Sequence, residues 1–230
     1  MKRDRVAERR PALIVGLGNP GTRYHKTRHN LGFEIVDRLV SGLAATHHER
    51  LAGSDLYRTR SAGISVGLLK PGKYMNLSGG PTLQAVTQLE IDPDRVLVVH
   101  DDLDLELGRL RLRSGGKSGG HRGIEDIIRA LGRANFPRLR IGIGRGASQD
   151  NDDADVGDDP DRRLRRQPIE QFVLEKFAPS EEGVMAVAVE RATEAALCWL
   201  RQGLQVAMDR YNSAASSKGD ALPPVPDGAS

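Results

Sequence analysis

The sequence predicts one α/β domain, built on a twisted, mixed and largely parallel sheet that is flanked by helices. Short apolar runs typical of buried strands alternate along the chain with segments whose apolar residues recur at helical spacing. The 230 residues, 38% of them hydrophobic, are also enough to form one good core. We expect the domain to span residues 12–212, between a disordered basic leader at 1–11 and a disordered tail at 213–230.

Local patterns justify the first elements. Residues 12–17 carry no polar side chain, which predicts a buried strand, and residues 33–45 place their apolar side chains on one face of a helix. Gly80 and Pro81 predict a helix start, because proline is tolerated at the first helical position. Between residues 109 and 113 leucines alternate with arginines, so we expect a strand with one apolar and one basic face.

The later elements follow from the same patterns. We expect strands at 64–70, 96–100 and 139–143, a helix at 123–131 that ends at Gly132, ordered structure again at 172–174, and one long helix at 180–208. Residues 149–167 contain seven aspartates and four arginines but almost no apolar residues. That composition predicts an exposed insertion in the domain.

Composition bears on where the protein works. The longest apolar runs are far shorter than the roughly 20 residues that a bilayer span needs, so we expect no contact with a membrane. The basic N-terminus is not followed by a long apolar stretch and makes a poor signal peptide. Cys198 is the only cysteine, so no intrachain disulfide can form and we expect a cytoplasmic protein.

Positive charge is concentrated in one part of the chain. Between Arg109 and Arg145, ten basic residues are opposed by only two acidic ones. Such a cluster suits a polyanionic partner, although a set of solvated strand and helix faces gives the same count.

A glycine-rich loop follows the first predicted strand. Gly16, Gly18 and Gly21 have the spacing of a dinucleotide-binding loop, but Pro20 lies inside the turn. The nearest acidic residue, Asp37, falls within a predicted helix rather than at the end of a second strand. The sequence has no Gly-x-Ser-x-Gly elbow and no recognised zinc spacing. We therefore expect no cofactor, no serine nucleophile and no metal.

The same loop brings a histidine to the end of the strand. An imidazole can remove a proton from water at neutral pH, and it does so better when a carboxylate such as Asp101 fixes its tautomer. Strand ends in an open α/β sheet converge on one crevice, so His29 and Asp101 can meet there with Asn19 and Asn76. For either asparagine taken alone, turn formation is the ordinary explanation.

Seven segments along the chain form an ordered set of motifs. They are Gly16-Leu-Gly-Asn-Pro-Gly21, Thr27-Arg-His-Asn30, Lys70-Pro-Gly-Lys-Tyr-Met-Asn-Leu-Ser-Gly79, His100-Asp-Asp-Leu-Asp104, Gly115-Gly-Lys-Ser-Gly-Gly-His121, Arg138-Leu-Arg-Ile-Gly-Ile-Gly144 and Phe172-Val-Leu174. In this order they resemble bacterial-type peptidyl-tRNA hydrolases. The resemblance runs from about residue 13 to residue 211 and omits only the tails and the predicted insertion.

The resemblance implies a monomeric, metal-free esterase that cleaves the bond between a peptide and the 3′ end of tRNA. Such an enzyme recycles tRNA from peptidyl-tRNA released from ribosomes. The resemblance implies that His29 is the general base and Asp101 its orienting partner, and that Asn19 and Asn76 hold the substrate or the attacking water. The positions matching its binding residues are Tyr24, Asn30 and Met75 for the peptide, and Arg113 and Arg140 for tRNA phosphate.

One position departs from the family pattern. An asparagine is expected after His121, and this chain has Arg122. A guanidinium only donates hydrogen bonds, whereas an amide both donates and accepts. Arg122 can still bind substrate, by polarising a carbonyl or holding a phosphate. The alternative function is therefore an RNA-binding homologue with weak or no hydrolysis, while the retention of His29 and Asp101 favours the enzyme.

Overall fold

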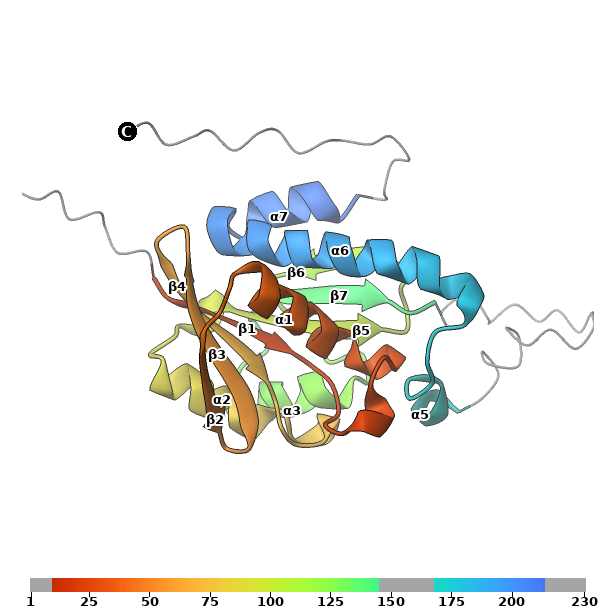
Figure 1. Cartoon of the computed structure of the whole chain (residues 1–230), viewed down its shortest axis with the longest axis horizontal. Coiled ribbons are helices and arrows are strands. Elements are labelled where there is room, and N and C mark those ends of the chain that lie inside the picture. Colours follow the sequence, from red (N-terminus) through yellow and green to blue (C-terminus); the bar gives the residue numbers. More distant parts are fainter. Residues whose placement is uncertain (1–9, 145–167, 214–230) are drawn as a thin grey trace, which may run out of the picture.

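The computed structural model describes residues 10–144 and 168–213. Seven strands form one mixed sheet in the order β2-β3-β4-β1-β5-β7-β6 (Figure 1). Strands β4, β1, β5 and β7 are parallel, while β2, β3 and β6 join antiparallel at the two sides. The strands are β1 Ala12–Gly16, β2 His47–Leu51, β3 Ser54–Ser61, β4 Ile64–Lys70, β5 Val96–Asp102, β6 Leu110–Arg113 and β7 Arg138–Gly142. The predicted α/β class and mixed sheet are confirmed, with the parallel strands at the centre.

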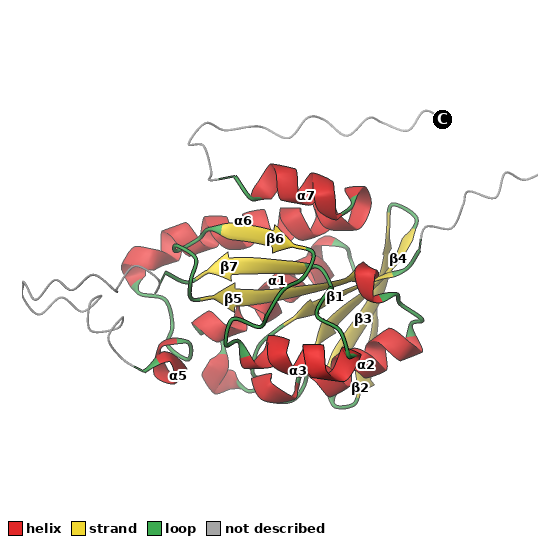
Figure 2. Ribbon diagram, turned by 180° about the vertical axis from the view of Figure 1, so that it is seen from behind, coloured by secondary structure: helices red, strands yellow, loops and turns green. Residues whose placement is uncertain are grey.

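Helices cover both faces of this sheet (Figures 1 and 2). On one face lie α1 (Leu31–Gly42), α6 (Pro179–Gln202) and α7 (Leu204–Tyr211), and on the other lie α2 (Gly79–Gln88) and α3 (Arg122–Leu131). Successive side chains of a strand point to opposite faces. Along β1, Ile14 packs into the buried cluster under α1 and α6, and Val15 packs into the one beside α2 and α3. Burial on both faces explains why β1 reads as a continuous apolar run.

The long helix predicted at 180–208 is wrong, because the structure divides it into α6 and α7. Gly203 separates them with a φ of 91°, a backbone conformation that favours glycine. Both helices pack on the same core, so the apolar pattern continues across the break and hides it. Strands β2 and β3 were not predicted, because their sequences are mostly polar and only one residue of β2 is buried.

The other predicted elements are present, with ends that differ by a few residues. Gly132 ends α3 with a φ of 66°, as its position predicted. The predicted insertion at 149–167 lies outside the described residues, as do most of the leader and the tail. Arg10 is described, and it pairs with Asp92 and Asp94 on the surface. Within the described ranges, no helix has the length and hydropathy to cross a membrane.

The topology places the functional loops. From β1 the chain runs to β4 on one side, and β5 lies on the other side of β1. In open α/β sheets, ligands bind at such a switch point, beyond the carboxyl ends of the strands. A short helix, α5 (Ile169–Phe172), lies at this end of the sheet (Figure 1).

Candidate active site

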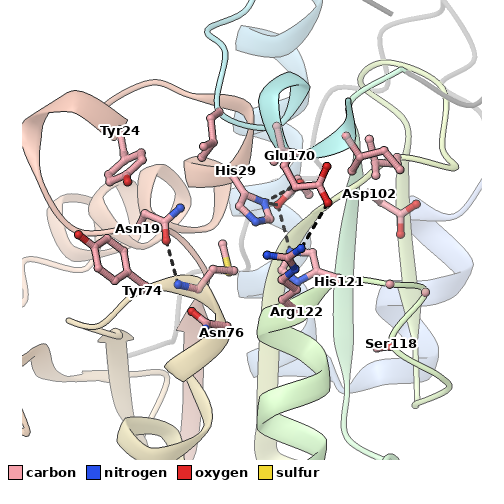
Figure 3. A pocket seen from close by; sticks show the side chains of 18 of the residues that line it. Asn19, Tyr24, His29, Tyr74, Asn76, Asp102, Ser118, His121, Arg122 and Glu170 are labelled. Atoms are coloured by element: carbon pink, nitrogen blue, oxygen red, sulfur yellow. Dashed lines mark hydrogen bonds and ion pairs between the residues drawn. The ribbon is translucent and has the colours of Figure 1, made fainter. Parts of the chain in front are cut away.

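A pocket of about 380 Å³ lies beyond the carboxyl ends of the central strands (Figure 3). Its walls come from the loops after β1 and β4, the end of β5, the glycine loop before α3, and α5. Of the predicted site residues, it brings together seven: Asn19, Tyr24, His29, Met75, Asn76, Asp101 and Arg122. Asn30, Arg113 and Arg140 do not line it.

His29 and Asp101 are in direct contact in this pocket. The Nδ1 of His29 lies 2.9 Å from Oδ1 and 3.0 Å from Oδ2 of Asp101. The carboxylate is almost completely buried, whereas the His29 side chain is 14% exposed and lines the pocket. An ionised carboxylate can only accept hydrogen bonds, so His29 carries its proton on Nδ1. The lone pair of the neutral ring is therefore on Nε2.

His121 binds the same carboxylate from the other side. Its Nε2 lies 3.2 Å from Oδ1 of Asp101. Its Nδ1 accepts hydrogen bonds from the backbone N–H groups of Gly123 and Ile124 and thereby caps helix α3. Since those amides can only donate, the proton of the neutral ring must be on Nε2, where it is donated to Asp101. This role was not predicted, because helix N-caps are usually Ser, Thr, Asp or Asn.

The charges of this cluster are set by burial and by its hydrogen bonds. Burial alone would raise the pKa of Asp101, but electrostatic attraction to His29 and hydrogen bonds from His121 and His29 outweigh it and lower that pKa below its usual range. His100 precedes Asp101 and is fully buried, and its desolvation, with the adjacent His121, holds its pKa well below the ordinary histidine value. Asp101 is therefore ionised at neutral pH and His100 is uncharged.

Asn19 is held by two partners. Asn30 donates from Nδ2 to the backbone carbonyl of Asn19 and accepts from its backbone N–H, at 2.9 and 2.8 Å. The side-chain Oδ1 of Asn19 accepts from the backbone N–H of Met75 at 2.8 Å. With its oxygen engaged, Asn19 has its amide nitrogen left for the pocket, and Figure 3 shows that nitrogen turned away from the dashed hydrogen bond of the Asn19 oxygen. Asn30 thus lies buried behind Asn19 rather than in the pocket.

One side of the pocket is apolar. Tyr24 and Tyr74 meet edge to face with ring centroids 6.4 Å apart. Ile169 and Leu174, which also line the cavity, are 50% and 40% exposed. Exposed apolar side chains gathered around one pocket indicate a ligand with an apolar part.

Arg122 and Asn76 stand at the rim. The Nη2 of Arg122 lies 3.3 Å from Oε1 of Glu170, and both side chains are largely exposed (Figure 3). The pair links the first residue of α3 to α5 across the pocket. Asn76 is exposed, in the short helical turn that precedes α2. Glu170 was not predicted as a site residue, because nothing in the sequence connects it to Arg122.

The predicted basic cluster separates into two kinds of arginine. Arg138 is buried and donates to the backbone carbonyls of Gly116, Lys117 and Ala134, and burial followed by the nearby Arg140 lowers its pKa to about 10. Arg138 therefore stabilises the glycine loop before α3 and is not available to bind a ligand. Arg113 is exposed, while Arg140 binds the Asp102 carboxylate.

Two arginines of the cluster, Arg111 and Arg113, lie on β6. Arg111 lies next to Arg140 in the sheet, and repulsion from Arg113, with some burial and further repulsion from Arg140 and Arg109, lowers its pKa. A cluster of cations that lower one another's pKa favours an anionic ligand.

The side chains of His29, Asp101 and His121 are of the types that bind metal ions. Ligand atoms of His29, Asp101 and His121 lie within 4.8 Å of one another. The hydrogen bonds described above account for all three groups with two protons in place of a cation.

An imidazole oriented by a buried carboxylate, in a pocket lined by amide and apolar side chains, is an arrangement typical of a hydrolytic enzyme. Residues 13–219 match the family described as Peptidyl-tRNA hydrolase. The chain therefore belongs to the peptidyl-tRNA hydrolase family.

Individual proteins of this family are similar to the chain over most of its length. The peptidyl-tRNA hydrolase of Aquifex aeolicus is 40% identical over 200 residues, which cover 87% of this chain and 95% of that protein. The one of Mycobacterium tuberculosis is 40% identical over 205 residues, covering 88% and 98%. The crystal structure of peptidyl-tRNA hydrolase from Acinetobacter baumannii is similar with a TM-score of 0.74 at 33% identity, covering 88% of this chain and 95% of that one.

Proposed function

We propose that this protein hydrolyses the ester between the peptide and the 3′ end of tRNA in peptidyl-tRNA released from ribosomes. It thereby returns the tRNA for reuse, with His29 as the general base and without a metal. The observation that carries the proposal is the 2.9 Å contact between Nδ1 of His29 and the buried carboxylate of Asp101. Asp101 accepts a hydrogen bond from the Nδ1–H group, so Nε2 is the basic nitrogen, on a ring that lines the pocket.

The reaction follows from this arrangement. Nε2 of His29 removes a proton from a water molecule as the water oxygen bonds to the ester carbonyl carbon. Asp101 stabilises the imidazolium that forms, because its ionised carboxylate is already in contact with Nδ1. When the C–O bond to the ribose breaks, the imidazolium returns the proton to the departing ribose oxygen. The products are a tRNA with its terminal hydroxyl restored and a peptide carboxylic acid, which releases the second proton of the water to solvent and becomes a carboxylate.

Asn19, Asn76 and the two tyrosines would bind the substrate and the attacking water. The Asn19 amide nitrogen can donate to the carbonyl oxygen as negative charge develops on it, since the Asn19 oxygen is held by Met75. Asn76 at the rim has the groups to hold the attacking water. The apolar surface of Tyr24 and Tyr74 suits peptide side chains of varied sequence.

The tRNA body would lie on the basic face of β6. Contacts from Arg113 to phosphate position an RNA without reading its sequence, as an enzyme for many tRNAs requires. Because the chain would meet its substrate in the cytoplasm, we place it there. A monomer suffices, since all proposed groups come from one chain.

The test uses the pure protein and an N-blocked aminoacyl-tRNA. We expect release of tRNA at the same rate with and without a chelator, and His29→Ala to lower turnover by roughly 10²-fold or more. His47→Ala, at an exposed position on β2, is the matched control and should match the parent. Loss of activity on chelation would overturn the metal-free mechanism. Tight tRNA binding without release would favour the RNA-binding homologue.

A further inference from the structure

Arg28, the residue before His29, is a fully buried cation. Its guanidinium carbon lies 4.4 Å from the ring centroid of Phe172 and 4.7 Å from that of Phe177. Nη1 and Nη2 donate to the two carboxylate oxygens of Glu181, at 3.2 and 2.7 Å. A planar guanidinium suits this combination of ring contacts and bidentate pairing, which an ammonium group cannot reproduce.

The partners of Arg28 come from three places in the chain. Phe172 is the last residue of α5, Phe177 lies in the link to α6, and Glu181 is in the first turn of α6. Glu181 also accepts from the backbone N–H of Ala178 at 2.8 Å, which closes the start of α6. The guanidinium is thus the common contact of α5, the link and α6.

The backbone beside Arg28 is joined to the same link. Its N–H donates to the carbonyl of Glu175 at 2.9 Å, and the N–H of His29 donates to the carbonyl of Val173 at 2.8 Å. Thr27 forms an antiparallel bridge with Lys176. The segment carrying the base is therefore paired with the segment that follows α5.

These two segments, the second taken together with α5, lie side by side and both line the pocket. His29 lies on one, and Ile169, Val173 and Leu174 lie on the other, while Arg28 itself does not line the cavity. Displacement of a catalytic group by about 1 Å can cost about 10²-fold in rate. Contacts that hold these two segments in a fixed relative position therefore keep His29 in place for the reaction.

We propose that Arg28 is a positioning residue, which with Glu181 locks the His29 segment to the apolar wall at 169–174. The inference rests on the proposed function, since the rate effect assumes that His29 is the base. Its structural part stands apart from it: the lock protects the amide hydrogens of residues 28 and 29 from exchange with solvent.

The test is Arg28→Lys, which keeps the positive charge and removes the planar fork. We expect a fall in kcat of at least about tenfold, faster amide exchange at residues 28 and 29, and affinity for deacylated tRNA unchanged within about twofold. The control is Arg95→Lys. Arg95 also stacks on an aromatic ring, 5.3 Å from the Trp199 centroid, but lies just before β5, at the end opposite to Asp101. It should retain parent kcat and exchange.

Glu181→Gln gives the second variant, because it keeps the shape of the side chain and removes only its charge. We expect the same direction of change with a smaller size. Parent-like kcat in folded Arg28→Lys, with only a lower Tm, would overturn the proposal, as would unchanged amide exchange. If the parent enzyme itself releases no tRNA, the proposed function fails, while the exchange measurement still decides whether the lock exists.

Discussion

Asp101→Asn tests the hydrogen-bond chain most sharply, because the change is nearly isosteric. His121 must donate from Nε2, since backbone amides of α3 occupy its Nδ1. The asparagine therefore keeps its oxygen toward His121, at the position of Oδ1, and places its NH₂ where Oδ2 stood, 3.0 Å from Nδ1 of His29. Nδ1 of His29 then lies 2.9 Å from the amide oxygen and 3.0 Å from the NH₂. Because that oxygen already accepts from His121 and the NH₂ can only donate, we expect His29 to shift its proton to Nε2 and accept from the NH₂. The nitrogen that should take the proton of water is then already protonated.

The size of the effect has two parts. A hydrogen bond to a charged group contributes about 1.5–3 kcal/mol, or about 10- to 150-fold in rate at roughly 1.4 kcal/mol per factor of ten. The wrong tautomer adds to this, and in serine proteases the equivalent change costs about 10⁴-fold. We therefore expect kcat to fall by about 10²- to 10⁴-fold.

The assay is release of tRNA from saturating N-blocked aminoacyl-tRNA, with Asp92→Asn on the surface as the control. Nitrogen-15 NMR of the imidazoles reports the tautomer directly. We expect the proton of His29 on Nδ1 in the parent and on Nε2 in Asp101→Asn, with His121 unchanged. A kcat within about threefold of the parent, or a His29 still protonated on Nδ1 in the variant, would refute the reasoning.

Three further predictions concern residues around this centre. Arg113→Ala should raise KM and flatten its dependence on salt, because a phosphate contact releases counterions, and an unchanged salt slope would exclude that contact. Arg122→Asn should lower kcat/KM by about tenfold, the scale of one charged hydrogen bond, and kinetics equal to the parent's would place Arg122 outside the reaction. Burial lowers the pKa of His100, so the unfolded chain takes up its proton first as the pH falls. The Tm should therefore decrease below about pH 6.5, at up to about 1.4 kcal/mol of stability per pH unit, and His100→Gln should reduce that slope relative to His47→Gln.

The sequence was most informative where one residue type has one use. Apolar runs buried on both faces predicted β1, β4 and β5, because few other structures accept them. Gly132 predicted the end of α3 through its backbone freedom. The polar strands β2 and β3 could not be predicted, since what orders them is pairing with β4 rather than a pattern of their own.

The site shows the same division. His29 and Asp101 were predicted as a pair, and the structure brings them into contact. His121 and Glu170 were missed, because their importance comes only from what lies next to them in space. Arg140 and Arg138 counted equally as basic residues, yet one binds Asp102 and the other holds a loop. Charge counted along a sequence does not tell which cations are already neutralised.

The ring of His121 closes the first turn of α3 and holds the Asp101 carboxylate at the same time. Fraying of that turn would release Nδ1 and let the ring adopt the other tautomer, which turns a lone pair toward the carboxylate. Local openings of this kind require less free energy than global unfolding. The enzyme would then lose activity on heating before its sheet melts, at temperatures where the amides of Gly123 and Ile124 begin to exchange. Its working range would be set by one turn of helix, so a stronger α3 would extend that range without any change to the core.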